Sequence, residues 1–509
     1  MPEPVEGGSY VEGVVGQPIA INPLIAGDND ADRDLVVLLF ASLFDLAENY
    51  KMDQTQKVWN ITLKENLKWS DGEPLTSDDV IFTIGTVQDP ETRSPIFVTW
   101  QGVLAERLSE RELRLTLKNP YAFFLDNIKN LRVAPRHIFD NIPPQNFRLS
   151  DFNLKPIGSG PYKFVSFQKR GDGFIEEYVL ESNKRYALKR PFIRNLKIRF
   201  FPDRMEVINA FNIKAIDGWG GLDQADLGNI KINHKILSAG RPRYYAIFFN
   251  QGVNPILKEK AVRSALAAAV DKQKILDQIL NGQGSIANGP IPPTVAGYDA
   301  QIFTDETFSL ENAAEILEKA GWKISDDGVR SKTIGKNKLK LEFDIVVPEA
   351  KFLVESANLI REDWKKIGVN LNPIILKPSD AVNNAIKPRN YQMILFGNTL
   401  NNNPDVFSFW HSSQRFDPGL NLSIFSDKTV DGLLESLRQN LDENSRQQDL
   451  SKLQKIINDA KPAVFLYSPK YLYATSKNLG GFSAESISFQ ASRFEKVNEW
   501  YLKTARVFK

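Results

Sequence analysis

Residues 58–82 read VWNITLKENLKWSDGEPLTSDDVIF and carry the most regular pattern in the chain. Val58–Leu63 alternates between apolar and polar side chains, which predicts a strand with one buried face. A short strand and a turn are expected next. Thr76 is followed three residues later by Asp79, and this spacing is typical of a capping box at the start of a helix. The stretch therefore predicts a strand, a turn and a capped helix in succession.

The composition limits the classes of function. The chain has 509 residues, with 64 basic and 62 acidic side chains and a net charge of +2. This length suggests about three domains or two large lobes. The balanced charge argues against nucleic acid or an acidic lipid surface as the main partner. There is no cysteine, and the three histidines lack a metal-binding spacing, so we expect no metal and no cofactor.

The pattern of the chain changes near Asn250. Beyond this point amphipathic helices alternate with strands, as in the expected helix over residues 355–367 and the strand over residues 369–375. The second half therefore has the character of α/β units. The longest apolar run, residues 35–44, is too short to span a bilayer.

Residues 396–413, FGNTLNNNPDVFSFWHSS, combine a strand end with clustered aromatic side chains. Residues 393–396 predict a buried strand, and Asn403 is expected to cap a short helix with Pro404 in its first position. The side chains expected on that helix are Phe407, Phe409, Trp410 and His411. This arrangement suits a ligand cleft. The alternative is an ordinary strand–loop–helix corner whose aromatic residues are core.

Two glycine-rich segments also stand out. Trp219 lies between glycines in residues 217–221, so it is either a core residue or a platform for a ligand, and both alternatives remain open. Gly158 and Gly160 suggest a phosphate loop, but no Gly-Lys-Ser/Thr follows and Pro161 breaks a helix start. A phosphate loop is therefore rejected.

Several blocks of the sequence resemble one family, the large extracytoplasmic solute-binding proteins of peptide and nickel ABC transporters (solute-binding family 5). Residues 59–82 are similar to the family signature almost residue by residue. The other blocks follow in the family's order: residues 156–162, 245–250, 262–266 with 270–271, 320–322, 367–369, 404–405 and 462–467. The resemblance covers most of the chain.

The resemblance implies an α/β, two-lobed, periplasmic-binding-protein-like fold of the large cluster C type that closes about a hinge. Lobe 1 is expected over residues 1–250, with residues 483–509 returning to it and an extra subdomain near residues 45–155. Lobe 2 is expected over residues 255–480. The hinge would lie near residues 250–255 and 480–483.

The same resemblance implies the substrate-binding component of an ABC importer, not an enzyme. It would capture an extended oligopeptide between two closing lobes and deliver it to a membrane permease and its ATPase subunits. We expect a monomer that binds no nucleic acid. The location would be extracytoplasmic, in the periplasm or as a cell-surface lipoprotein, with the signal peptide and any lipid-anchor cysteine absent from this chain.

Ligand contacts are implied by position in the family. The peptide would add as a strand along Gly397 to Asn401. The implied ligand-binding residues are Gly27, Asp28, Asn29, Trp100, Trp219, Gly220, Gly397, Asn398, Thr399, Leu400, Asn401, Asn402, Phe407, Trp410 and His411. Accordingly, Trp219→Ala and Trp410→Ala are expected to weaken ligand binding with little loss of fold.

Two departures from the family pattern bear on the ligand. Dipeptide and oligopeptide binders of the family carry an Asp before the Pro-Asp pair that holds the free amino terminus of the peptide. Residues 400–403 are Leu-Asn-Asn-Asn, so this carboxylate is missing, which favours longer or internal peptide segments or a neutral ligand. A short segment that the family usually has near residues 43–50 is also absent.

Other functions remain as alternatives. One alternative is that a protein of this fold binds a sugar, nickel or haem instead of a peptide. Another is that it is a sensor or chaperone-like peptide binder that works without a permease. Catalysis would have to use His411 with Ser412 or Ser413. Because adjacent residues on a helix point apart, this cluster is interpreted as structural.

Overall fold

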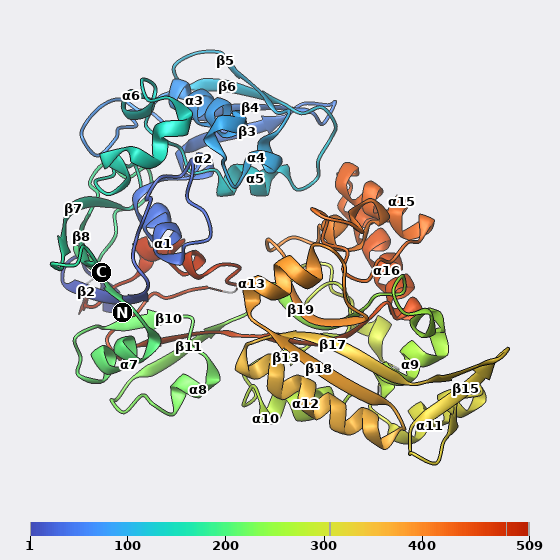
Figure 1. Ribbon diagram of the computed structural model, residues 1–509. Helices are drawn as coiled ribbons and strands as arrows, with labels where there is room; N and C mark the ends of the chain where they lie inside the picture. Colours follow the sequence, from blue (N-terminus) through green and yellow to red (C-terminus); the bar gives the residue numbers. More distant parts are fainter. Residues whose placement is uncertain (1, 305–306, 485, 507–509) are drawn as a thin grey trace. The chain divides into compact units, whose positions relative to one another are not determined.

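The structure is a computed structural model that describes residues 2–304, 307–484 and 486–506. The chain forms two compact units, which we call lobe 1 (Met1–Ala239 and Tyr471–Lys509) and lobe 2 (Gly240–Lys470). Each lobe combines sheets with helices (Figure 1), so the fold is α/β and two-lobed, as expected. Within the described part of the chain, no helix has the length and apolar character to cross a membrane.

The main sheet of lobe 1 joins distant parts of the chain. Its described strands, in spatial order, are β11 (Lys235–Ala239), β21 (Tyr471–Thr475), β10 (Gly218–Gly220), β2 (Ser9–Val15), β9 (Asn195–Phe201), β8 (Ile175–Ser182) and β7 (Tyr162–Lys169). β2 is parallel to β10 and to β9, and the remaining pairs are antiparallel. The main helices of this region are α1 (Asp30–Leu39) and α7 (Arg204–Asn212).

The opening stretch of the sequence forms a second sheet in lobe 1. The strands, in spatial order, are β3 (Ala47–Met52), β4 (Val58–Leu63), β6 (Glu112–Thr116) and β5 (Leu104–Arg107). Alternate residues of β4 are buried, as the sequence pattern predicts. Thr76 and Asp79 form a reciprocal capping box at the start of α3 (Ser77–Gln88), which confirms the predicted helix start. This sheet lies inside the region expected as an extra subdomain.

Shorter elements complete lobe 1. The helices are α2 (Leu43–Leu46), α4 (Phe97–Trp100), α5 (Phe124–Asn130), α6 (Arg136–Phe139) and α8 (Gln224–Leu227). β1 (Pro2–Pro4) pairs antiparallel with β22 (Thr504–Arg506). Gly158 and Gly160 pass the backbone of Leu39 so closely that a Cβ at either position would lie within 2.5 Å of it, which gives a packing reason for this glycine pair.

Lobe 2 is built on a sheet covered on both faces. Its described strands, in spatial order, are β13 (Gly284–Ile286), β20 (Ala463–Pro469), β12 (Arg243–Phe249), β19 (Met393–Thr399), β17 (Glu342–Pro348) and β18 (Asn370–Leu376). On β12 and β19, odd-numbered residues such as Ile247 and Leu395 belong to one core, and even-numbered ones such as Phe248 and Ile394 to another. The sheet is therefore buried on two sides.

The helices of lobe 2 supply these two cores. One core contains residues of α9 (Lys260–Ala268), α10 (Lys272–Gln278), α11 (Leu310–Lys319) and α12 (Lys351–Lys366). The other contains residues of α14 (Phe407–Trp410), α15 (Lys428–Gln439) and α16 (Glu443–Ala460). Figure 1 shows α12 and α15 on opposite sides of the sheet. The short strands β14 (Lys323–Ile324), β15 (Arg330–Ile334) and β16 (Asn337–Lys340) form a separate small sheet, and α13 (Pro378–Asp380) precedes β19.

The lobe boundaries fall earlier in the chain than the sequence suggested. β12 was expected in lobe 1, but it pairs with β19 and β20 and so belongs to lobe 2. β21 was expected in lobe 2, but it pairs with β10 and β11 in lobe 1. The two crossings therefore lie at residues 239–240 and 470–471, because strand pairing decides to which lobe a segment belongs.

A buried ion cluster fastens the C-terminal segment to lobe 1. The Arg493 guanidinium donates to both oxygens of Asp34, at 2.9 and 2.6 Å, and to Glu12 Oε1 at 2.9 Å. Tyr473 donates to the second oxygen of Glu12 at 2.6 Å. The side chains of Arg493, Glu12 and Asp34 are fully buried. Burial raises the pKa of Asp34 from 3.8 to about 6, although the charge of Arg493 opposes the shift.

Candidate ligand-binding site

The end of strand β19 has an unpaired edge. β12 pairs with β19 along its whole length, from Met393 to Thr399. On the other side, β17 pairs with β19 only at Met393 and Ile394. Among the described residues, no strand continues this pairing beyond Ile394. The last part of β19 is therefore an open edge in a sheet that is otherwise paired there, and we call residues 395–399 the open edge.

The register shows which backbone groups face outward. The Leu400 N–H donates to the Pro242 carbonyl at 2.6 Å, which makes this a hydrogen-bonded position of the β12–β19 ladder. Hydrogen-bonded and non-hydrogen-bonded positions alternate along an antiparallel pair. Gly397 and Thr399 therefore direct their backbone N–H and C=O groups away from β12, toward the open edge.

Side chains on both faces hold the open edge in place. Asn398 Nδ2 donates to Tyr244 Oη at 2.8 Å, and burial raises the pKa of Tyr244, so this phenol stays neutral. On the opposite face, Arg243 Nε donates to Thr399 Oγ1 at 2.7 Å. Tyr244 and Arg243 both belong to β12. The polar side chains of Asn398 and Thr399 therefore hold β19 in place, and the outward backbone groups of the open edge stay available to a ligand.

Gly397 is required by a close contact on the same strand pair. A Cβ at this position would lie 2.7 Å from the ring of Tyr245, which is directly opposite in the register. The Tyr245 ring in turn contacts Phe352 and Tyr467, with ring centroids 5.1 and 5.6 Å away. The glycine thus lets an aromatic cluster reach the base of the open edge.

The loop after β19 differs in detail from the expectation. Leu400 is buried, while Asn401 and Asn402 are exposed, and Asn402 has φ of 58°. Asn403 accepts from the Asp405 N–H at 3.1 Å in a turn, and α14 begins only at Phe407. The predicted helix start at Asn403 and Pro404 is therefore wrong, because the turn precedes the helix.

His411 lies just beyond α14, and its ring is used for local structure. Its Nδ1 accepts from the Ser413 N–H at 3.1 Å and lies 2.7 Å from Ser413 Oγ. Nε2 lies 3.4 Å from Glu435 Oε1, and the ring stacks on Phe407 at 4.1 Å. The argument that the helix turns His411 away from the serines was wrong, since the imidazole caps the turn that holds them.

The structure does not place the predicted tryptophans on an accessible surface. Trp100 packs against Phe124, and Trp219 and Trp410 lie in separate hydrophobic cores with exposed fractions of 1% and 0%. Their ring faces are covered by the lobe that contains them. The expectation that these three indoles line a ligand site is therefore corrected to a core role.

The glycines beside Trp219 have a packing explanation. A Cβ on Gly218 would meet the hydroxyl of Tyr10, and one on Gly220 would meet the hydroxyl of Tyr471. The hydroxyls of these two tyrosines lie against β10, on the face opposite the Trp219 indole. Gly220 is therefore explained by close approach within lobe 1, and nothing marks it as a ligand contact.

The loop before α1 is also largely committed to local contacts. Asn29 caps α1, because its side chain accepts from the Ala31 and Asp32 N–H groups. Asp28 is exposed and pairs with Arg33 at 2.5 Å. Gly27 is half-buried, with open space around its Cα. Of this set, Gly27 and Asp28 remain accessible for a ligand.

Sequence reasoning missed the role of β12 in this site. Arg243, Tyr244 and Tyr245 hold the open edge, yet none of them was among the residues expected at the site. Their partners across the ladder could be named only once the register between two segments about 150 residues apart was known.

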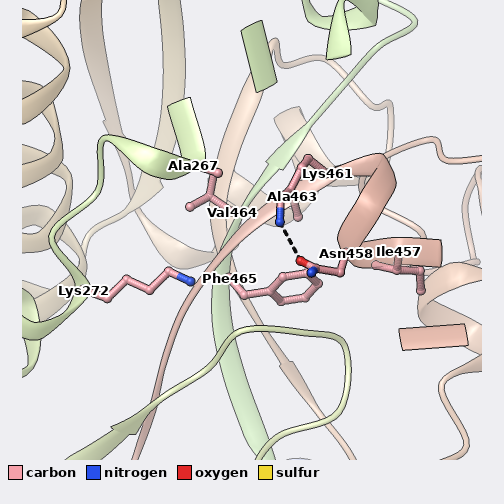
Figure 2. Close-up of a pocket in the computed structure, with 8 residues that line it drawn as sticks. All are labelled: Ala267, Lys272, Ile457, Asn458, Lys461, Ala463, Val464 and Phe465. Carbon is pink, nitrogen blue, oxygen red and sulfur yellow. Dashed lines mark hydrogen bonds between the residues drawn. The ribbon is translucent and has the colours of Figure 1, made fainter. Parts of the chain in front are cut away.

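A separate cavity in lobe 2 does not compete with the open edge. Figure 2 shows its lining, which includes Lys272, Asn458, Lys461 and Phe465. Lys461 Nζ donates to Asn458 Oδ1 at 2.6 Å, and Lys272 Nζ donates to Asn288 Oδ1 at 2.7 Å. The cavity volume of about 10 Å³ holds about one water molecule.

A two-lobed fold with an open sheet edge suits a protein that binds a solute. Residues 44–417 match the bacterial extracellular solute-binding proteins, family 5 Middle, and the chain belongs to this family. It is accordingly a binding protein and not an enzyme, and its place is outside the cytoplasm.

Among its relatives is the oligopeptide-binding protein AppA of Bacillus subtilis (strain 168). AppA is 28% identical over 506 residues, which cover 94% of this chain and 90% of AppA. The structure of AppA in complex with a nonapeptide matches with a TM-score of 0.75 at 26% identity, covering 98% of this chain and 100% of AppA.

Two further solved structures are similar. The ABC transporter substrate-binding protein CtaP from Listeria monocytogenes has a TM-score of 0.82 at 25% identity and covers 98% of this chain and 99% of its own. NikZ from Campylobacter jejuni, in complex with Ni(L-His), has a TM-score of 0.77 at 26% identity and covers 97% and 99%.

Proposed function

We propose that this protein is the substrate-binding component of an ABC importer and that it captures an extended oligopeptide. The observation that carries the proposal is the open edge of β19, where Gly397 and Thr399 direct backbone donors and acceptors away from β12. The similarity to AppA, which is described in complex with a nonapeptide, supports a peptide as the solute.

Strand addition is the mode of binding that this geometry favours. A peptide backbone presents the same alternating donors and acceptors whatever its side chains, so pairing with the open edge gives affinity that tolerates many sequences. Asn398 and Thr399 are held by β12, and this pre-ordering lowers the entropy lost on binding. The ligand contacts that we retain in lobe 2 are therefore mainly backbone contacts of residues 397–401.

The loop after β19 offers no charged anchor for the amino terminus of a peptide. Residues 400–403 carry no carboxylate, and the nearest following acid, Asp405, lies 3.0 Å from Arg438 Nε. An ammonium group placed beside these residues would meet only amide and main-chain oxygens. Peptides longer than a dipeptide, bound through internal residues, fit this site better than short peptides recognised by their ends.

We further propose that the lobes close about the two crossings at residues 239–240 and 470–471. Two adjacent crossings and a compact core in each lobe suit a hinge motion. The closed, loaded protein would act as a monomer and deliver its peptide to a membrane permease with ATPase subunits. Anchoring as a lipoprotein would keep it close to that permease.

A non-peptide solute is the alternative. NikZ, at a similar level of identity, is described with Ni(L-His), so a metal complex is the main rival class. Sugar stacking loses its support because Trp100, Trp219 and Trp410 are buried. A sensor or chaperone-like role would use the same open edge without a permease.

Native mass spectrometry of gently purified protein tests the proposal. We expect bound peptides of mixed sequence that denaturation releases, because strand addition reads backbone and not side chains. Release of a metal complex or a sugar only, with no thermal stabilisation by any member of a peptide library, would overturn the peptide assignment.

A further inference from the structure

Arg243 lies across the end of the open edge. It is the first residue of β12 and stands directly opposite Thr399, the last residue of β19. Residues opposite each other in an antiparallel pair share a face of the sheet. Arg243 Nε donates to Thr399 Oγ1 at 2.7 Å, and Nη1 lies 3.4 Å from Tyr245 Oη. The guanidinium is thus held beside the end of β19, next to the open edge.

The partners of Arg243 differ from those of the buried arginines in the described part of the chain. Arg493 and Arg330 engage carboxylates. Arg263 and Arg389 engage several main-chain carbonyls each. Arg243 is half-buried and bonds only hydroxyl groups, and no carboxylate of the described residues pairs with it. A guanidinium has five N–H donors, so most of this donor capacity is available to a ligand.

The end of β19 has no acidic side chain that could offset the charge of Arg243. Residues 395–404 contain no acidic side chain, and the carboxylate of Asp405 is engaged by Arg438. The open edge therefore lacks a carboxylate for an ammonium ion, but Arg243 offers a guanidinium to an anion.

We propose that Arg243 is a specificity-determining residue that binds a carboxylate of the ligand beside Thr399. This inference rests on the proposed peptide function. The planar fork of an arginine matches the two oxygens of a carboxylate, and charge-assisted pairs of this kind are stronger than neutral hydrogen bonds. The carboxylate has two sources in a peptide, an acidic side chain or the free C-terminus.

Calorimetry with three peptides of one neutral sequence separates these sources. The first has an amidated C-terminus, the second a free C-terminus, and the third an amidated C-terminus with one Glu scanned through the sequence. We expect the wild-type protein to bind the second peptide, or one Glu position of the third, at least about tenfold more tightly than the first. Which peptide gains identifies the source of the carboxylate.

Three variants test whether Arg243 causes this preference for a peptide that carries a carboxylate. In Arg243→Gln the preference ratio should fall to about one, and Arg243→Lys should retain part of it, because the charge stays but the fork is lost. Thr399→Val should also lower the ratio, since it removes the hydroxyl that positions Nε. Arg361→Gln, an exposed arginine on α12, is the matched control and should keep the wild-type ratio.

The outcomes that contradict the inference are distinct from failure of the proposed function. If wild-type protein binds the three peptides equally, or if Arg243→Gln keeps the full preference, the role of Arg243 is overturned while peptide binding stands. If no peptide binds the wild-type protein, both the proposed function and this inference fall.

Discussion

Trp219 and Trp410 show how burial changes the interpretation of single residues. Both were expected to contact ligand, yet each indole is enclosed in a hydrophobic core of its own lobe. In the sequence, a tryptophan between glycines has the same appearance whether it packs inward or stacks on a ligand. Only the tyrosine hydroxyls that cross β10 explain the glycines beside Trp219, and these contacts come from residues distant in sequence.

The structure therefore reverses the expected effect of truncating these indoles. Trp219→Ala and Trp410→Ala should each lower the free energy of unfolding by about 3–5 kcal/mol, because a large buried side chain leaves a cavity. Chemical denaturation measures this loss. Phe416→Ala is the control, since this ring is 64% exposed and its loss should change stability little. If the free energy of unfolding is unchanged and the ligand affinity is weakened, the indoles belong to the binding site and not to the core.

Strand β19 carries the functional argument at the level of elements. Its apolar first half was predicted from the residue pattern, whereas a role for its polar end in strand addition was implied only by the family resemblance. The open edge itself was not visible in the sequence, because it depends on where β17 stops pairing with β19. The strand and capped helix within residues 58–88 were predictable, since alternation and capping are local signals. Pairing between distant segments is not local.

A proline at Thr399 tests the open edge directly. The Thr399 N–H faces away from β12, so Thr399→Pro removes a donor to the ligand without removing a bond of the ladder. We expect peptide affinity to fall at least about tenfold below that of Thr399→Val, which loses the same hydroxyl but keeps the N–H. Titration calorimetry on both variants gives the comparison. Equal affinities would argue that Thr399 makes no backbone contact with the peptide.

At the scale of the whole molecule, the fold class was predictable and the lobe boundaries were not. The family resemblance spans most of the chain, and the two-lobed α/β fold is confirmed. The expected boundaries near Asn250 and Gly480 came from the family resemblance, and only the first coincides with a change in sequence character. The structure moves β12 into lobe 2 and β21 into lobe 1, because sheet membership follows pairing with strands from other parts of the chain.

The cluster of Arg493, Asp34 and Glu12 predicts a pH dependence of stability. The pKa of Asp34 is about 6 in the folded protein, whereas an exposed aspartate in the unfolded chain has a pKa of 3.8, and burial is the main cause of the difference. Between these values the folded protein holds more protons than the unfolded chain, so stability falls as pH rises from about 4 to about 6. Acidification from pH 7 to pH 5 should therefore raise the free energy of unfolding by on the order of 1–3 kcal/mol through this group.

Asp34→Asn isolates this contribution. The variant should show a smaller rise in stability on acidification, because it removes one of the two buried carboxylates of the cluster whose pKa is raised and leaves only Glu12 there, whereas the exposed Asp28→Asn should keep the full rise. Denaturation curves at pH 5, 6 and 7 give the slopes. An unchanged slope in Asp34→Asn would mean that this carboxylate does not control the pH response.

Hydrogen exchange at the amides of Gly397 and Thr399 tests the central claim, that a peptide adds as a strand to β19, most directly. On saturation with a bound peptide, the structure predicts slower exchange at these two outward-facing amides, while the edge strand β18 of the same sheet keeps its exchange rate. If peptide saturates the protein and exchange at Gly397 and Thr399 does not change, the peptide binds elsewhere and the strand-addition account is contradicted.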